Sequence, residues 1–154
     1  MIIKYNSKNA TKLYNKKLKE IEKYTGDKTT YLSQLNIIGK QLLGSKFKGV
    51  FPSDKIPKLT DKVCYCILNV NKSTESGSHW VSLAKIENNE SLFYDSFGRE
   101  GVQLIKHLKY SGNGKIVDAE RDIEQQEIQL NCGARSLSFL CILDKYGAEM
   151  AKWI

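Results

Sequence analysis

The chain has 154 residues, of which 41% are hydrophobic and 27% charged, with only two prolines. This length and composition are typical of one soluble globular domain, spanning residues 1–154, and exclude a disordered or collagen-like chain. No apolar stretch approaches the ~20 residues of a membrane span, so we expect no membrane association. Residues 1–9 are polar and lack the apolar region of a signal peptide, so nothing points to secretion.

Lysine and arginine number 24 against 17 acidic residues, which gives a net charge of +7. This charge permits binding to a polyanion but does not specify one. The four cysteines have no C-x-x-C spacing, and with only two histidines we expect no metal site. We interpret the cysteines as reduced thiols of an intracellular compartment.

The first part of the chain predicts two helices. Tyr14, Leu18 and Ile21 recur with helical spacing, which indicates an amphipathic helix over about 11–24 that ends at Gly26. A second helix, capped by Thr29 or Thr30, carries Leu32, Leu35, Ile38 and Leu42 on one face, with Gly44 just past its end. We expect these N-terminal helices to span about 11–43, followed by a catalytic core over about 47–147.

The middle of the chain predicts a sheet. Phe47 to Pro57 is interpreted as turns, and residues 62–70 as a strand in which Cys64 and Cys66 are small core residues. Residues 80–86 and 91–95 form a hairpin, and residues 115–119 are a further strand. A helix over 101–108 and a buried helix beginning at Cys132 complete an α+β fold, with a central, mostly antiparallel sheet flanked by helices.

Cys132 is the candidate nucleophile. It is followed by Gly133 at the expected start of the last helix, where backbone N–H groups and the helix dipole favour a thiolate. Gly133 places no side chain beside the sulfur, so a substrate backbone can approach closely. A cysteine at this position can also be a packing residue.

His79 and Asp95 are the candidate base and its orienting carboxylate. His79 stands at the start of the first hairpin strand and Asp95 at the end of the second, so antiparallel pairing makes them neighbours across the strands. A carboxylate there can fix the imidazole tautomer and stabilise the imidazolium. Asp95 can also serve simply to open the turn that follows it.

Gln126 lies six residues before Cys132, and its amide can donate to an oxyanion together with the Cys132 backbone N–H. Its neighbour Gln125 can do the same, and the spacing does not decide between them.

The order His79-Trp80, Asp95, Gln126 and Cys132-Gly133 resembles that of the adenovirus-protease and Ulp1-like clan of cysteine peptidases. The stretches Gly49-Val50-Phe51-Pro52-Ser53-Asp54 and Tyr94-Asp95-Ser96-Phe97-Gly98 resemble the adenain-type branch, found in adenoviruses, virophages and Polinton-like elements. The resemblance covers about residues 32–146. Before Cys132 the chain departs from the family, which usually has Pro-Asn between the glutamine and the cysteine, whereas here Glu127 to Asn131 intervene.

The resemblance implies a cysteine protease fold of the adenain/Ulp1 type, with Cys132 as nucleophile, His79 as base, Asp95 orienting His79, and Gln126 in the oxyanion hole. Trp80 is implied to pack beside the site and to help form a narrow substrate groove. The implied activity is endopeptidase cleavage of viral capsid or core precursors after small residues, often glycine. Implied activators are DNA and a viral peptide; no other cofactor is expected, and we expect a monomer in the virion, the host cytoplasm or the viral factory.

Two other functions are compatible with the sequence. One is an isopeptidase of the same clan that removes a ubiquitin-like or SUMO-type modifier. The other is a catalytically silent, basic DNA-binding or capsid-associated protein. The complete set of Cys132, His79, Asp95 and Gln126 argues against the silent protein, and the Phe47–Pro57 segment and short chain argue against the isopeptidase.

Overall fold

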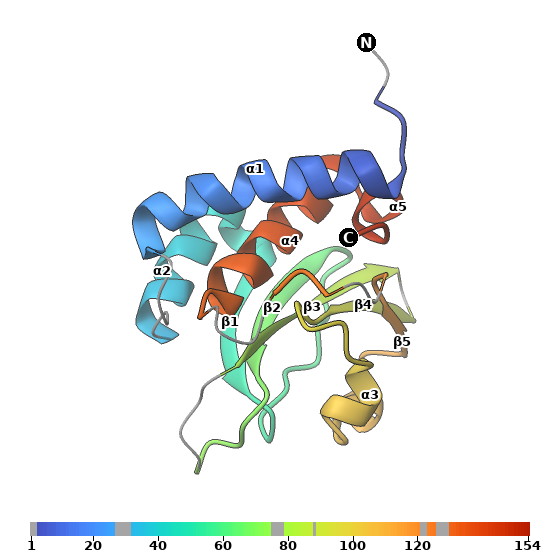
Figure 1. Ribbon diagram of the computed structural model, residues 1–154. Helices are drawn as coiled ribbons and strands as arrows, with labels where there is room; N and C mark the ends of the chain where they lie inside the picture. Colours follow the sequence, from blue (N-terminus) through green and yellow to red (C-terminus); the bar gives the residue numbers. More distant parts are fainter. Residues whose placement is uncertain (1–2, 27–31, 75–78, 88, 121–122, 126–129) are drawn as a thin grey trace.

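The computed structural model describes residues 3–26, 32–74, 79–87, 89–120, 123–125 and 130–154. One five-stranded sheet is surrounded by helices, which confirms the α+β class (Figure 1). The strands are β1 (Phe47–Pro52), β2 (Cys64–Asn69), β3 (Trp80–Glu87), β4 (Glu90–Tyr94) and β5 (Lys115–Asp118). The helices are α1 (Ser7–Thr25), α2 (Leu32–Leu43), α3 (Gly101–Leu104), α4 (Cys132–Tyr146) and α5 (Ala148–Ala151), with 3₁₀ turns η1 (Gly44–Lys46) and η2 (Leu108–Tyr110).

The sheet is mixed, so the expectation of a mostly antiparallel sheet is wrong. β2 pairs with β3 and β3 with β4 in antiparallel fashion, whereas the edge strands β1 and β5 run parallel to β2 and β4. Parallel neighbours are joined by long crossover connections. Local sequence patterns therefore do not predict which neighbour an edge strand pairs with, or whether the pairing is parallel or antiparallel.

β1 corrects the interpretation of Phe47 to Pro57 as turns. Gly49 has φ +127°, and the pairing register with β2 shifts between Phe47 and Val50. A glycine at such a shift allows an irregular strand, and Pro52 is tolerated because it ends an edge strand. The glycine and proline that suggested turns are thus features of a short, irregular edge strand.

α1 confirms the predicted amphipathic helix and begins four residues earlier than expected. The Asn6 side chain accepts a hydrogen bond from the Asn9 backbone N–H at 2.9 Å, which caps the first turn. The helix ends where expected, at Gly26, whose φ is +72°. The buried residues lie on one face: Ala10, Tyr14, Leu18 and Ile21.

α2 forms as predicted but buries a different set of residues. Leu35 and Ile38 are buried, whereas Leu32 is 50% and Leu42 37% exposed. Gly39 and Leu43 take their place on the inner face, because the Phe47 side chain lies directly against Gly39. The predicted caps, Thr29 and Thr30, lie outside the described residues. The helix predicted over 101–108 is confined to the single turn of α3, followed by η2.

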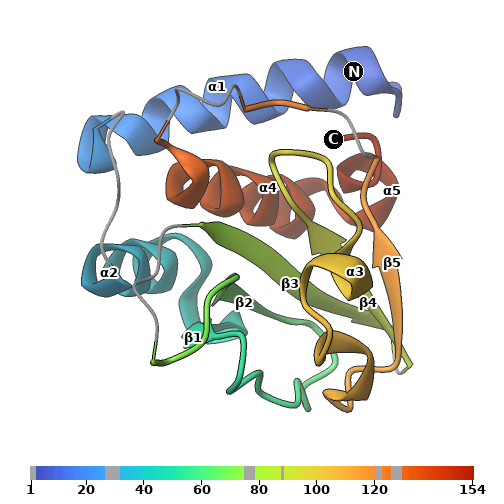
Figure 2. The same cartoon turned by 60° about the horizontal axis from the view of Figure 1, so that its bottom comes forward.

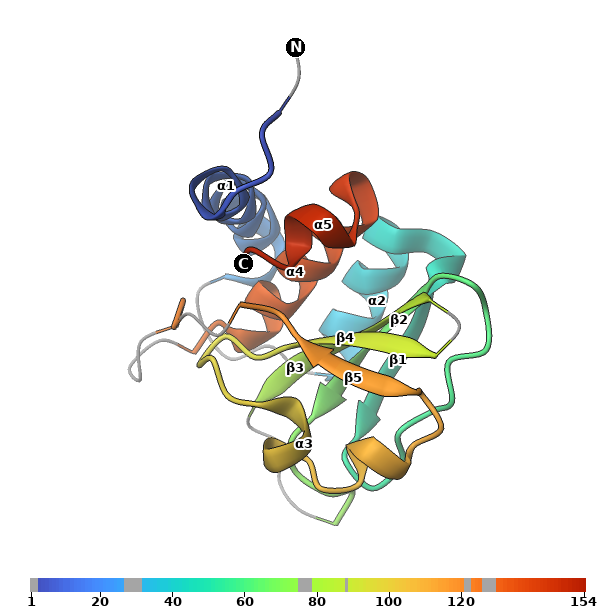
Figure 3. The same cartoon turned by 90° about the vertical axis from the view of Figure 1, so that its right-hand side faces the viewer.

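The helices form two layers on one face of the sheet. α4 lies against the sheet and α1 crosses the outer side of α4, while α3 covers the opposite face (Figures 1, 2 and 3).

Successive side chains of β2 point to opposite faces of the sheet. Tyr65 and Ile67 belong to the core beneath α4, whereas Cys64 and Cys66 belong to the second core, on the other face. This confirms that Cys64 and Cys66 are buried on one strand face. α4 is buried nearly all round, as its sequence predicted.

The first core includes the C-terminal segment of the chain. Met150 and Ala151 of α5 and the terminal Ile154 are buried in it. No helix in the described part of the chain is long and apolar enough to cross a membrane.

One end of the sheet brings together several chain segments. β3 begins at Trp80, directly after His79, and β4 ends at Tyr94, directly before Asp95. The start of α4 is held there by β3, because the Ser136 hydroxyl donates to the Trp80 carbonyl at 3.1 Å and the Ser82 hydroxyl donates to the Ser136 carbonyl at 2.8 Å. This end carries the candidate site.

The contact between α2 and β1 gives a stability prediction. A Cβ at Gly39 would lie 2.5 Å from the Phe47 ring, which is itself 3% exposed. We expect Gly39→Ala to lower the free energy of unfolding by about 1–3 kcal/mol despite the higher helix propensity of alanine. Urea denaturation measures this, with the exposed Ser33→Ala in the same helix as control. Equal stability of Gly39→Ala and the wild type would contradict the close packing.

Candidate active site

His79 and Asp95 are in direct contact. His79 Nε2 lies 2.6 Å from Asp95 Oδ1. The register pairs Ser82 with Tyr94, so His79 and Asp95 lie just beyond the neighbouring ends of β3 and β4. The hairpin therefore brings the two side chains together, as its spacing predicted.

Asp95 is a buried carboxylate with several donors. Its side chain is fully buried, and Arg99 donates from Nε to Oδ2 at 2.6 Å. The backbone N–H groups of Phe97 and Arg99 donate to Oδ1 and Oδ2, each at 3.2 Å. Burial raises the pKa of Asp95, but hydrogen bonds and charge from His79 and Arg99 outweigh it and lower the pKa to about 2. Asp95 is therefore an anion at neutral pH.

Arg99 was not identified from the sequence. Its position four residues after Asp95, with Gly98 between them, was the available signal. The Gly98 N–H donates to the Asp95 carbonyl at 2.8 Å in a turn that needs the positive φ of Gly98, +73°. This turn carries Arg99 back onto the Asp95 carboxylate.

Cys132 begins α4 and meets His79. The two side chains are hydrogen-bonded to each other, and Asp95 contacts the same ring through Nε2. The Asn131 side chain does not cap the helix. Cys132 therefore stands among the backbone N–H groups that open α4.

The electrostatics favour a protonated imidazole at His79. Burial lowers the pKa of His79, but the hydrogen bonds with Asp95 and Cys132 and their negative charge outweigh burial and raise it above its ordinary value. In contrast, burial raises the pKa of the Cys64, Cys66 and Cys141 thiols. These three thiols are therefore poorer nucleophiles at neutral pH than free cysteine.

The glutamine pair is only partly described. Gln126, the predicted oxyanion donor, lies outside the described residues. Gln125 is 2% exposed, and its Oε1 accepts a hydrogen bond from the Ser96 hydroxyl at 2.6 Å. Its backbone N–H also bonds the Ser96 carbonyl at 3.1 Å, so the segment before α4 is tied to the turn after Asp95.

Trp80 and Gly133 lie beside the candidate residues. Trp80 is 5% exposed and belongs to the same core as Cys132. It therefore supports the site from the protein interior and has little surface for a substrate groove. Gly133 is also buried, in the first turn of α4. The substrate-binding roles of both residues stay predictions.

A buried polar network holds α4 next to the site, and sequence reasoning did not find it. Arg135, 6% exposed, donates to Asn131 Oδ1 at 2.9 Å and to the Tyr14 hydroxyl at 3.4 Å. The Tyr14 and Tyr94 hydroxyls are 2.6 Å apart, and Asn131 also donates to Glu22 at 3.4 Å. A charged residue three positions after the cysteine in an otherwise apolar helix was the signal, since buried charges need partners.

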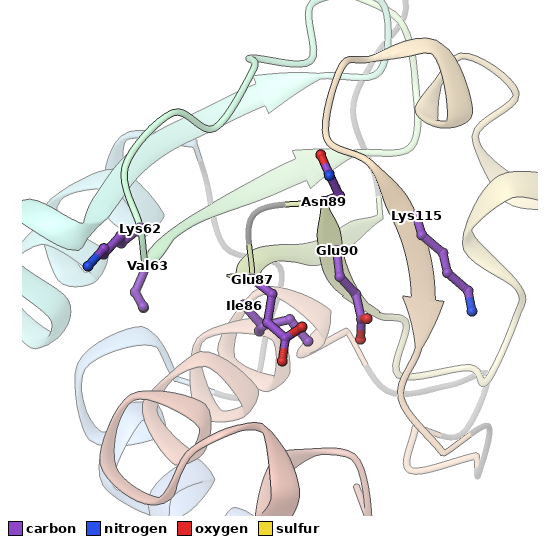
Figure 4. A pocket seen from close by; sticks show the side chains of 7 residues that line it. All are labelled: Lys62, Val63, Ile86, Glu87, Asn89, Glu90 and Lys115. Atoms are coloured by element: carbon purple, nitrogen blue, oxygen red, sulfur yellow. The ribbon is translucent and has the colours of Figure 1, made fainter.

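One hollow in the described part of the chain lies away from these residues. It has a volume of about 600 Å³ and is formed at the opposite end of β3 by Lys62, Val63, Ile86, Glu87, Asn89, Glu90 and Lys115 (Figure 4). Side chains of both charge signs line it, and none is a candidate catalytic residue. In the described part of the chain, no group of three or more His, Cys, Asp or Glu side chains could hold a metal ion.

Comparison with models of known protein families gives no match, and comparison with curated protein sequences gives none either.

The contacts of His79 predict its titration. We expect the pKa of His79 to be raised in the wild type and to be lower in Asp95→Asn than in the wild type, because the carboxylate that raises it is then absent. Proton NMR titration of the ring Hε1 signals measures this, and the chain has only two histidines. The Hε1 signal of exposed His107 is the internal reference for the spectra of both proteins. An unchanged His79 pKa in Asp95→Asn would contradict the contact.

Proposed function

We propose that the protein is a cysteine endopeptidase in which Cys132 is the nucleophile, His79 the general base and acid, and Asp95 the residue that orients His79. The observation that carries this proposal is the position of the His79 ring, which contacts Asp95 through Nε2 and is hydrogen-bonded to Cys132. These three roles are those of the nucleophile, the base and the orienting residue in cysteine–histidine nucleophilic catalysis.

In the first step, His79 takes the proton of the Cys132 thiol, and the thiolate attacks the carbonyl carbon of a peptide bond. The raised pKa of His79 and the ionised Asp95 stabilise the resulting imidazolium. The Cys132 backbone N–H and a glutamine amide, from Gln126 or Gln125, would donate to the oxyanion.

In the second step, the C–N bond breaks and the His79 imidazolium gives its proton to the leaving amine, which leaves a thioester on Cys132. Water, deprotonated by His79, then attacks the thioester carbonyl. The acid is released and the thiol is restored.

The substrate class follows from the resemblance to adenain-type proteases. We propose cleavage of viral capsid or core precursors after small residues such as glycine, during virion maturation in the viral factory, the host cytoplasm or the virion. An isopeptidase acting on a ubiquitin-like modifier would use the same chemistry. The product of digestion distinguishes the two activities.

Replacement of Cys132 tests the mechanism. We expect Cys132→Ala to abolish cleavage of a capsid precursor while the fold is retained, and Asp95→Asn to lower kcat substantially but leave measurable activity. Mass spectrometry of the digest measures cleavage and maps the cleaved bonds, and circular dichroism checks the fold. Cys141→Ala, in the same helix, is the matched control and should cleave normally.

Retained cleavage by Cys132→Ala would refute the mechanism. Cleavage of a SUMO or ubiquitin fusion, with the capsid precursor left intact, would show that the protein is an isopeptidase and not the proposed endopeptidase.

We also propose that the outer face of α1 binds DNA. Five exposed lysines recur at spacings of three or four residues on the side of α1 opposite its buried face, and we name this set the α1 lysine stripe: Lys8, Lys12, Lys16, Lys19 and Lys23. None of them makes an ion pair with another described residue, and Glu20 beside them pairs with Lys17 at 2.8 Å.

The length of the α1 lysine stripe suits an extended polyanion. At about 1.5 Å per residue, Lys8 and Lys23 are roughly 22 Å apart along the helix. DNA offers a phosphate charge about every 1.7 Å of duplex axis, so several phosphates fall within reach of the stripe.

Charge removal tests DNA binding. We expect the triple variant Lys12→Gln, Lys16→Gln and Lys19→Gln to bind duplex DNA more weakly and with less dependence on salt. Each lost phosphate contact makes the slope of log affinity against log salt shallower by about 0.9. Fluorescence anisotropy at several salt concentrations measures this. The control is Lys40→Gln, Lys62→Gln and Lys106→Gln, which removes the same charge from exposed lysines elsewhere. Equal losses in the two variants would show that net charge, and not the α1 lysine stripe, determines binding.

A further inference from the structure

Arg99 and Asp95 form a two-point contact inside one short segment. Arg99 Nε donates to Oδ2 at 2.6 Å, and Nη2 lies 3.5 Å from Oδ1. The Asp95 side chain is fully buried, whereas the Arg99 side chain is 45% exposed. His79 and Arg99 therefore hold different oxygens of the carboxylate, His79 the oxygen Oδ1 and Arg99 mainly Oδ2.

The Arg99 side chain is also fixed from a second direction. Its guanidinium carbon lies 5.3 Å from the centre of the Phe97 ring. The centre of the same ring is 5.1 Å from that of the His79 ring, at an interplanar angle of 38°. Phe97 thus contacts both the arginine and the histidine, and its own N–H donates to Asp95 Oδ1 at 3.2 Å.

The backbone N–H groups of Phe97 and Arg99 already hold one carboxylate oxygen each at 3.2 Å, and the Arg99 side chain adds the shorter contact at 2.6 Å. The planar fork of an arginine, with two N–H groups on the two oxygens, fixes the plane of the carboxylate as well as its charge. A lysine supplies the charge without the fork. Replacing Arg99 by lysine therefore separates the contribution of the positive charge from that of the fixed carboxylate plane.

We propose that Arg99 is a positioning residue, which clamps Asp95 so that Oδ1 faces His79 and the His79 ring stays oriented toward Cys132. The proposal rests on the proposed cysteine chemistry, and it assigns Arg99 no contact with substrate. In the described part of the chain, the groups that raise the pKa of His79 are Asp95, from the turn after β4, and Cys132, from α4, and the groups that lower the pKa of Asp95 are His79 and Arg99.

The proposal is tested by the reactivity of Cys132 toward iodoacetamide, a neutral reagent that needs no substrate site. The second-order rate of alkylation, followed from pH 5 to 9 by mass spectrometry of the Cys132 peptide, reports the thiolate. We expect Arg99→Gln to lower the rate at pH 6 by about tenfold, which corresponds to one pKa unit. Arg99→Lys should recover only part of this loss, because the ammonium cannot form the fork. Lys106→Gln removes one exposed positive charge elsewhere and should react like the wild type.

A double-variant comparison decides whether Arg99 acts through Asp95. We expect Arg99→Gln to have no further effect in an Asp95→Asn background, because there is then no carboxylate to position. A tenfold loss that persists in Asp95→Asn would overturn the proposal and show that Arg99 acts on Cys132 directly. An unchanged rate in Arg99→Gln would also overturn it. If Arg99→Gln does not fold, as judged by circular dichroism, Arg99→Lys with and without Asp95→Asn gives the same comparison.

The failure of this proposal is distinguishable from that of the proposed function. Absence of precursor cleavage, together with the expected alkylation pattern, would refute the peptidase and leave the role of Arg99 intact. Where a substrate is cleaved, a role in positioning lowers kcat with little change in KM. A change confined to KM would mean that Arg99 binds substrate, which contradicts the proposal.

Discussion

The geometry of the candidate site depends on the burial of α4. This helix lies between the sheet and α1, so it cannot shift without disturbing the core on both sides. It also contains Arg135, whose guanidinium would be costly to bury without partners. Tyr14 and Asn131 supply those partners, and the hydroxyl of Tyr14 continues the network to Tyr94. Packing and polar contacts together fix the helix end that carries Cys132.

The second constraint is a row of contacting charged and titratable side chains that runs from the surface to the Cys132 thiol. Half-exposed Arg99 contacts buried Asp95, Asp95 contacts His79, and His79 contacts Cys132. The pKa of Asp95 is lowered and that of His79 is raised, so each charge stabilises the next. Below the folded pKa of His79 the His79–Asp95 pair also favours the folded protein, and this contribution is lost as the pH rises through that pKa.

Local sequence patterns predicted the helices and strands that depend on residues close together in the chain. The helical spacing of Tyr14, Leu18 and Ile21 gave α1, and the hairpin spacing brought His79 to Asp95. β1 was missed because its Gly49 and Pro52 have the same local appearance in a turn and in an irregular edge strand. The parallel edges of the sheet were missed because pairing between distant segments leaves no periodic signal.

The buried polar residues were harder to predict for a different reason. Arg99 and Arg135 look like ordinary surface cations in the sequence, and their partners come from a turn in one case and from α1 in the other. Arg99 needed the positive φ of Gly98 to fold back, and Arg135 needed Tyr14, which is 121 positions away in the chain. Such side chains become interpretable only after the packing that surrounds them is known.

α1 has two faces of different chemistry, and their separation limits how a ligand on this helix could act on the site. The outer face carries the α1 lysine stripe, whereas the inner face packs on α4. The polar contacts from α1 to the beginning of α4 run through Tyr14 to Arg135 and through Glu22 to Asn131. A polyanion bound to the lysines touches neither contact directly. Any effect of it on Cys132 must therefore pass through a shift of α1 as a whole, which the packing of Ala10, Leu18 and Ile21 resists.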